Sequence, residues 1–236
     1  MKIREVPLVL AMLVAIAGAA QLFEDSFDDG NADGWTEYSN YPDSTDYYVE
    51  AGWYHLLVSG CGNANVFSFN GDNEGTTPHQ MSIPDYTVFC QVVGFSPTDH
   101  VGVVGRMFTP LADEKAYVLW MRYNAQSLEL WRHDGPASFS AIATCALPLS
   151  YEQVYWVRFD LWGGLLRGKV WQGSFRDEPE EYLLSAYDTT YPDPGSVGFG
   201  AHSFDYATNY AAFDSVMVCD PLSLDAGTWG AIKSSF

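Results

Sequence analysis

The fold class of this chain is decided by residues 117–132, YVLWMRYNAQSLELWR. Aromatic, β-branched and other apolar residues fill both ends of this stretch, and the polar residues 124–127 suit a turn, so it predicts a β-hairpin. Residues 157–171, VRFDLWGGLLRGKVW, predict a second and tighter hairpin across Gly163 and Gly164. No stretch of the interior shows the sustained 3.6-residue period of an amphipathic helix.

Similar short stretches follow one another along most of the chain, separated by turn residues such as Asp-Gly and Pro-Gly pairs. The expected strands are 22–27, 47–50, 53–58, 65–69, 86–95, 101–108, 115–123, 127–132, 154–162, 165–172, 181–187, 196–202 and 210–219. About thirteen such strands predict an all-β protein with a two-sheet antiparallel jelly-roll sandwich. We expect the last strand to return beside the first.

Residues 1–20 have the pattern of a secretory signal peptide. Lys2 and Arg4 precede an apolar run over 8–17, and Ala17-Gly18-Ala19 fits a cleavage site before Ala20 or Gln21. An N-terminal anchor that is never removed is the alternative. We therefore expect a domain over 21–220, a C-terminal tail over 221–236 that forms one short helix with Thr228 as N-cap, and export to the extracellular space, the cell surface or the periplasm.

The charge of the chain is strongly negative. The formal net charge is −19, and no Lys or Arg occurs between Arg4 and Arg106. Such a surface repels phosphates, so nucleic acid and anionic membranes are not expected as partners, and no later stretch is long enough to insert into a membrane. Solubility outside the cell and calcium binding by some of the carboxylates both account for the acidity.

The four cysteines allow one or two disulfides in an exported protein. They are Cys61, Cys90, Cys145 and Cys219. Their spacing matches no zinc motif, and three pairings are open. Isolated buried thiols are the alternative, because each cysteine lies in an apolar or strand-like context.

Several motifs, in this order, resemble those of a known family. They are FEDSFDDG at 23–30, DGW at 33–35, VEAGWY at 49–54, YWVR at 155–158, LRGKVW at 166–171, GSVGFG at 195–200 and FDSVMV at 213–218. Together they resemble the concanavalin A-like, laminin G-like jelly-roll domains of secreted bacterial proteins, over residues 22–219. The resemblance implies a β-sandwich that binds carbohydrate or mediates adhesion, with some glycoside hydrolases among its relatives. It also implies a structural calcium ion between the first and last strands.

Two sets of residues are candidates for calcium. Asp29, Asn31 and Asp33, followed by Gly34, repeat the opening spacing D-x-N-x-D-G of a calcium loop. Asn40 at position twelve excludes an EF-hand, and Asx turns are the alternative explanation of this stretch. The family resemblance implies the other set, Asp25 or Asp28 near the first strand with Asp214 on the last.

The sequence contains no recognisable catalytic motif, which favours a non-catalytic function and leaves open an enzyme built from carboxylates that are distant in sequence. No E-x-D-x-x-E strand of the kind that β-glucanases of this fold carry occurs, and the five histidines form no metal-binding pair. The acidic run 177–181 is expected to be a solvated turn. The alternative functions are a glycoside hydrolase-like enzyme of the same fold and a purely structural cell-surface protein.

Tyrosines in acidic, turn-rich segments are the candidate ligand-binding residues, since sugars stack on aromatic faces while carboxylates accept from their hydroxyls. They are Tyr38, Tyr41, Tyr47 and Tyr48 in one segment and Tyr191, Tyr206 and Tyr210 in the other. The tryptophans inside strands are expected to pack within the fold. We therefore predict a non-catalytic, calcium-stabilised module that binds a glycan or polysaccharide; the sequence leaves its oligomeric state open.

Overall fold

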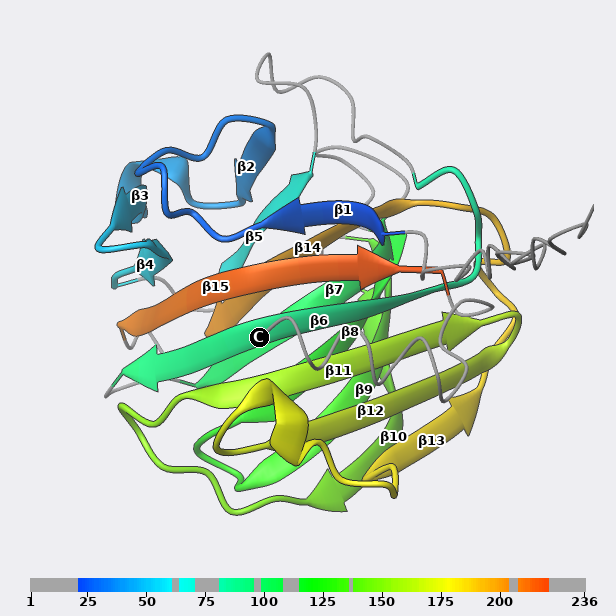
Figure 1. Cartoon of the computed structure of the whole chain (residues 1–236). Helices are drawn as coiled ribbons and strands as arrows, with labels where there is room; N and C mark the ends of the chain where they lie inside the picture. The colour runs from blue at the N-terminus through cyan, green and yellow to red at the C-terminus, as the bar shows by residue number, and fades with distance from the viewer. Residues whose placement is uncertain are drawn as a thin grey trace, which may run out of the picture.

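The computed structural model describes residues 21–60, 64–70, 81–95, 99–107, 115–135, 138–203 and 208–220. These residues form two antiparallel sheets packed face to face (Figure 1), so the predicted all-β jelly-roll sandwich is confirmed. The predicted leader, the tail with Thr228, Cys61 and Tyr206 lie outside the described residues. No helix within the described ranges is long and apolar enough to cross a membrane.

Sheet A, which faces the viewer in Figure 1, has the strand order β13-β12-β11-β6-β15-β4-β3, and β1 pairs with part of β15. Its strands are β1 (Gln21–Asp25), β3 (Thr45–Glu50), β4 (Trp53–Val58), β6 (Tyr86–Phe95), β11 (Tyr155–Trp162), β12 (Leu165–Trp171), β13 (Leu184–Tyr187) and β15 (Asn209–Cys219). Single 3-10 turns precede β3 (η1, Pro42–Ser44) and follow β12 (η2, Phe175–Asp177).

Sheet B lies behind it, with the order β10-β9-β8-β7-β14-β5-β2. Its strands are β2 (Trp35–Ser39), β5 (Ala64–Asn70), β7 (His100–Met107), β8 (Lys115–Arg122), β9 (Ser127–Gly135), β10 (Ser138–Ala146) and β14 (Ser196–Ser203). The two predicted hairpins are confirmed as β8–β9 and β11–β12, the second with Trp162 opposite Leu165. The last strand also returns beside the first, as expected.

Two strands of sheet B were not predicted. β10, SFSAIATCA, consists mainly of small and polar residues, with Phe139 and Ile142 as its large apolar residues, because it is a partly exposed edge strand. β2 contains Tyr38, so the expectation that this residue lies in a turn-rich segment is wrong.

Alternating residues of the two sheets meet in one aromatic-rich core. Phe199 of β14 stacks on Phe213 of β15 with ring centroids 4.2 Å apart. The centroids of Trp35 and Tyr54 lie 4.7 and 4.9 Å from that of Phe199. Burying one such ring contributes roughly 2–3 kcal/mol. This cluster joins β2 and β14 of sheet B to β4 and β15 of sheet A.

The disulfide prediction is wrong for the described cysteines: Cys90, Cys145 and Cys219 are free. They lie on different surfaces, since Cys90 faces the core, Cys219 faces away from it on sheet A, and Cys145 is on β10. Burial raises the pKa of Cys219 to about 12, so its thiol is neutral. The buried-thiol alternative therefore holds for Cys90 and Cys219.

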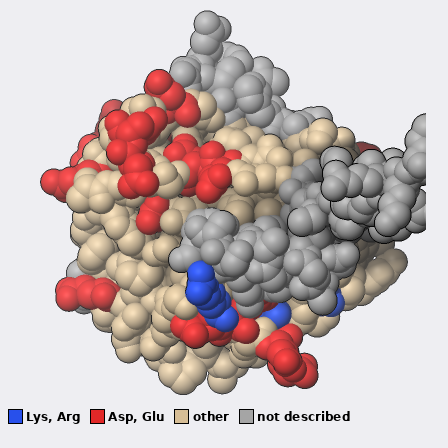
Figure 2. Space-filling model, in the orientation of Figure 1, with Lys and Arg blue, Asp and Glu red and all other residues tan. Residues whose placement is uncertain are grey.

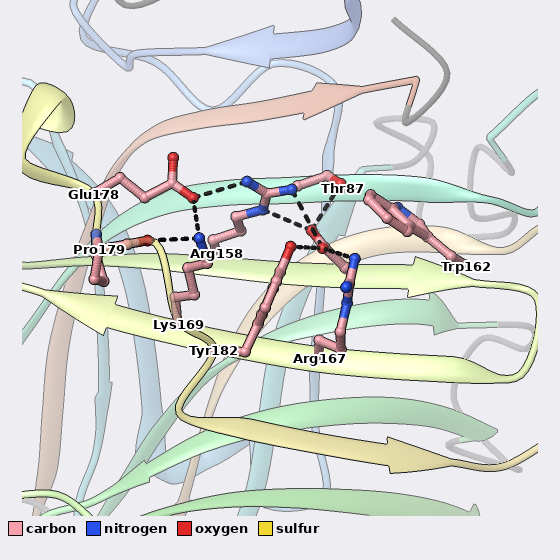
Figure 3. A network of polar contacts seen from close by, with 9 residues as sticks. Thr87, Arg158, Trp162, Arg167, Lys169, Glu178, Pro179 and Tyr182 are labelled. Atoms are coloured by element: carbon pink, nitrogen blue, oxygen red, sulfur yellow. Dashed lines mark hydrogen bonds and ion pairs between the residues drawn. The ribbon is translucent and has the colours of Figure 1, made fainter. Parts of the chain in front are cut away.

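A polar network covers one end of the outer face of sheet A (Figure 3). Asp160 on β11 is fully buried and accepts hydrogen bonds from Thr87 at 2.9 Å, from Arg158 at 2.7 Å, from Arg167 at 3.0 Å and from the Tyr182 hydroxyl. Every donor comes from a different segment. The carboxylate therefore joins β6, β11, β12 and the segment that follows η2.

Glu178 is the second carboxylate of this network. It accepts from Arg158 at 2.8 Å and from Lys169 at 2.9 Å, and its side chain is only 2% exposed. Burial would raise the pKa of Glu178, but the bond from Lys169 and the charge of Arg158 outweigh it and hold that pKa below its ordinary value. The expected solvated turn is thus wrong at Glu178, because two cations draw its side chain onto the sheet.

Removing the hub of this network tests its contribution to stability. We expect Asp160→Ala to lower the free energy of unfolding by about 3–5 kcal/mol, because it removes a buried carboxylate from Arg167 and from Arg158, of which Arg158 keeps its ion pair with Glu178. Urea unfolding at neutral pH measures the change. The control is Glu181→Ala, an exposed acidic residue for which a change within about 0.5 kcal/mol is expected. A similar small loss for Asp160→Ala would contradict the role of Asp160.

Candidate functional site

A groove crosses the outer face of sheet A at the end opposite the polar network. Its volume is about 440 Å³, within the size range of small-molecule sites. Mainly apolar and aromatic residues line it, together with two carboxylates: Glu50, Ala51, Trp53, His55, Val93, Phe95, Glu152, Val154 and Ala212.

The β3–β4 hairpin forms one wall of the groove. Ala51 and Gly52 make its two-residue turn with φ of +53° and +79°, the left-handed pair that a tight hairpin requires. This turn sets Glu50 opposite Trp53. Because side chains alternate along β4, Trp53 and His55 face the groove while Tyr54 enters the core.

An aromatic ladder continues from the groove along the same face. The Tyr48 ring stacks on His55 at 4.8 Å, and the Tyr210 ring stacks on Phe95 at 4.4 Å. The hydroxyls of Tyr48 and Tyr210 lie 3.2 Å apart, and the Tyr210 hydroxyl lies 2.9 Å from His55 Nδ1. The fold thus joins Tyr48 and Tyr210, one from each of the two predicted tyrosine segments.

His55 and Tyr210 of this ladder are neutral near pH 7. Burial lowers the pKa of His55 below its ordinary value. Burial, followed by the hydrogen bond with Tyr48, raises the pKa of Tyr210 to about 12. The neutral imidazole of His55 and the neutral phenol of Tyr210 can donate and accept hydrogen bonds, as a hydroxyl-rich ligand requires.

The carboxylates of Glu50 and Glu152 flank the groove from separate segments. Glu50 ends β3, whereas Glu152 lies in the connection that leads into β11, where its backbone N–H donates to the Gly94 carbonyl at 2.9 Å. Both residues are exposed. Sequence reasoning did not select Glu50, Glu152, Trp53 or His55, because only the pairing of β4 with β15 and of β15 with β6 brings them together.

The other predicted tyrosines lie elsewhere. Tyr38 is buried on the outer face of sheet B against Phe67, and Tyr47 donates to the Tyr38 carbonyl. Tyr191 is buried and donates to Asp134 at 2.6 Å. Tyr41 is 40% exposed beside η1. None of these four lines the groove, and their role in binding stays a prediction.

The acidic turn after β1 has the bonds of successive Asx turns. The backbone N–H of Asn31 donates to Asp29 Oδ1 at 3.1 Å, and that of Asp33 donates to Asn31 Oδ1 at 2.8 Å. These are the bonds that the Asx-turn alternative predicts. Among the described residues, no group of three His, Cys, Asp or Glu side chains has an arrangement that would hold a metal ion as it stands.

Asp25, Asp28 and Asp214 form the second predicted calcium set. Asp25 accepts from the Phe27 N–H at 2.9 Å and from Trp35 Nε1 at 2.6 Å, while Asp28 accepts from Ser26 at 3.0 Å. Burial raises the pKa of Asp214, and the negative charges of Asp28 and Asp25 raise it further. The fold therefore brings this set into electrostatic contact at the junction of β1 and β15.

Three histidines that are distant in sequence share the outer face of sheet B. His100, His133 and His202 are fully buried, and they pack with Trp120 and Trp131 at ring-centroid distances of 5.5–6.4 Å. Neither ring nitrogen of His133 has a hydrogen-bond partner within the described part of the chain. Burial lowers the pKa of His133 to about 4 and that of His202 to about 3. This cluster could not be predicted from the sequence, because the three histidines are far apart in the chain and only the pairing of their strands brings them together.

Comparisons with known proteins support the fold. No protein-family model and no curated protein matches the sequence. Among solved structures, the carbohydrate-binding module CBM66 from Bacillus subtilis is similar with a TM-score of 0.59 and 13% identity, over 80% of this chain and 98% of that one. A Bacillus subtilis protein of unknown function with a galectin-like fold has a TM-score of 0.57 and 13% identity, over 85% and 96%.

The exoplasmic/lumenal domain of VIP36, in its form bound to Ca²⁺ and Man3GlcNAc, is similar as well. Its TM-score is 0.53 at 11% identity, over 78% of this chain and 83% of that one. At such identities the likeness concerns the fold alone, a two-sheet β-sandwich, which the family resemblance also implied. The finer laminin G-like assignment stays a prediction.

The buried histidines predict acid destabilisation. As the pH falls below about 6.5, the unfolded chain binds protons at His133 and His202 while the folded chain does not until about pH 4 and 3. The free energy of unfolding therefore decreases as the pH falls from about 6.5 to about 4, and His133 alone accounts for a decrease of about 3 kcal/mol. Urea unfolding at a series of pH values should show this slope, and a His133→Gln variant should flatten it. An equal slope in the variant would contradict the assignment.

Proposed function

We propose that this chain is an exported carbohydrate-binding domain and that the groove beside the β3–β4 hairpin holds the glycan. The observation that carries the proposal is the composition of this groove, which joins an apolar and aromatic floor to two exposed carboxylates. The signal-peptide pattern of residues 1–20 supports export.

The chemistry of the lining suits a sugar. The rings of Trp53 and Phe95 offer faces for the apolar C–H side of a pyranose, while Glu50 and Glu152 accept from its hydroxyls. His55 and Tyr210, both neutral, add groups that donate and accept. CBM66 is a carbohydrate-binding module by its name, and one of the VIP36 structures contains Man3GlcNAc. Carbohydrate binding by proteins of similar fold supports the proposal.

A glycoside hydrolase-like activity is the second candidate, because Glu50 and Glu152 line the same groove. Glycosidases of both stereochemical classes use two carboxylates that flank the scissile bond. Release of reducing ends from a bound polysaccharide, lost in Glu50→Gln, would establish this activity. Binding without such release leaves the domain a binding module.

We also propose a structural calcium ion at the junction of β1 and β15, held by Asp25, Asp28 and Asp214. The donors are all oxygen atoms, the ligands that calcium prefers. Burial is the main cause of the raised pKa of Asp214, and the negative charges of Asp28 and Asp25 raise it further; a cation bound there would relieve this repulsion. The ion would stiffen the junction, and the protein's own contacts would recognise the sugar.

Calcium binding is tested by thermal unfolding in calcium and in EDTA. We expect calcium to raise the Tm of the wild type, Asp214→Asn to abolish this rise, and Asp33→Asn to leave it intact. In EDTA near pH 7, Asp214→Asn should be more stable than the wild type, because it removes a half-buried charge that its neighbours disfavour. No rise in the wild type would refute the calcium proposal, and loss of the rise in Asp33→Asn alone would assign the ion to the turn after β1.

Glycan binding is tested on an array of glycans with residues 21–236, in calcium and in EDTA. We expect selective binding, and Trp53→Ala should weaken it about tenfold or more by removing a stacking face. The matched control is Tyr187→Ala, which removes a 75% exposed aromatic ring outside the groove. Absence of binding to every glycan would argue against the proposed function, and unchanged binding by Trp53→Ala would argue against the groove.

A further inference from the structure

We propose that the groove selects positively charged glycans, namely polysaccharides with free amino groups, and discriminates against glycans with carboxylate or sulfate groups. This inference rests on the proposed function, since it names the class of sugar that the same groove takes.

The lining itself contains negative charge only. Glu50 and Glu152 are its acidic residues, and none of its nine residues is a Lys or an Arg. His55 is the remaining titratable residue of the lining; its imidazole is neutral near pH 7, because burial lowers its pKa. A ligand in the groove therefore meets two carboxylates and no countercharge from the lining.

The surroundings extend this negative field. Asp28 Oδ1 lies 3.2 Å from the position that a Cβ atom would occupy at Gly52, so the acidic turn after β1 contacts the hairpin that forms the groove wall. Figure 2 shows acidic side chains gathered over the end of sheet A where β1, β3 and β4 lie, with the basic ones confined to the other end. A second hollow, at β1 and the turn that follows it, is lined by four more acidic residues: Glu24, Asp25, Asp28 and Asp29.

Six of the Lys and Arg side chains in the described ranges are paired with acids at other places in the fold. The strands that form the groove lie within 45–95 and 209–219, and the sequence has no Lys or Arg between Arg4 and Arg106 or between Arg176 and Lys233. Arg158, Arg167 and Lys169 bind Asp160 and Glu178 in the network of Figure 3. Arg106, Arg122 and Arg132 are likewise paired with acids. These cations are therefore engaged away from the groove.

An ammonium group on the sugar would gain from both features of the site. It would pair with Glu50 or Glu152 and could also lie over an aromatic face, which attracts cations. Contacts of this kind at an exposed rim strengthen binding about 3- to 10-fold, and salt weakens them. A carboxylate or sulfate in the same place would be repelled by a similar amount.

Isothermal titration calorimetry tests the inference with three β-1,4-linked hexamers of equal length. They are glucosamine, with ammonium groups; glucose, which is neutral; and glucuronic acid, with carboxylates. We expect the glucosamine hexamer to bind about 3- to 10-fold tighter than the glucose hexamer, with the glucuronic acid hexamer weakest. Raising the salt from about 0.1 M to about 1 M should reduce these differences.

The double variant Glu50→Gln/Glu152→Gln should lose the preference, so that it binds the glucosamine and glucose hexamers with equal affinity. The control Glu180→Gln/Glu181→Gln removes two exposed acidic residues near the polar network, alters the net charge equally, and should keep the preference. Equal affinities for all three hexamers would overturn the inference and leave the proposed function standing. A preference that both double variants lose equally would overturn it too, since the overall charge would then be the cause. No binding to any hexamer or array glycan would overturn both proposals.

Discussion

The pairing of β15 with three other strands is the constraint on which this structure depends. β15 lies between β6 and β4 over 210–213, and β1 takes the place of β4 over 216–219. The change occurs at a β-bulge after Asp214, where Ser215 adopts a φ of +50°. Phe213 anchors the strand in the core against Phe199, while Tyr210, Ala212 and Asp214 face outward. One strand therefore positions the core, the groove and the acidic junction.

The outer face of sheet A is divided by charge. The segment that follows η2 covers the end formed by β11 and β12, where Asp160 and Glu178 neutralise Arg158, Arg167 and Lys169. The other end keeps an open groove with unneutralised carboxylates. Because the cations are used to fix the covering segment, the remaining surface near the groove is acidic. The ion pairs that hold the covering segment on β11 and β12 therefore also leave the groove without cations, as a positively charged ligand requires.

The sequence predicted those parts of the structure that depend on local pattern. The β8–β9 and β11–β12 hairpins follow from apolar strands joined by turn residues, and closure of the sandwich by its first and last strands was expected. The edge strand β10 was missed because its small and polar residues carry no apolar pattern. The groove was missed because Trp53, Phe95 and Glu152 meet only through strand pairing between distant segments. Tyr48 and Tyr210 were selected for their acidic neighbours, but their contact with His55 required the three-dimensional fold.

NMR chemical-shift mapping on the folded domain distinguishes the groove on sheet A from the other surfaces as the place where a glycan binds. A ¹⁵N-labelled sample of residues 21–236 would be titrated with a glycan that binds on the array. If the groove holds the glycan, the largest shifts will occur at the β3–β4 hairpin, at the Trp53 indole, and at the ends of β6 and β15 near Phe95 and Tyr210. Shifts concentrated instead on the outer face of sheet B, around Trp131 and His133, would contradict binding in the groove.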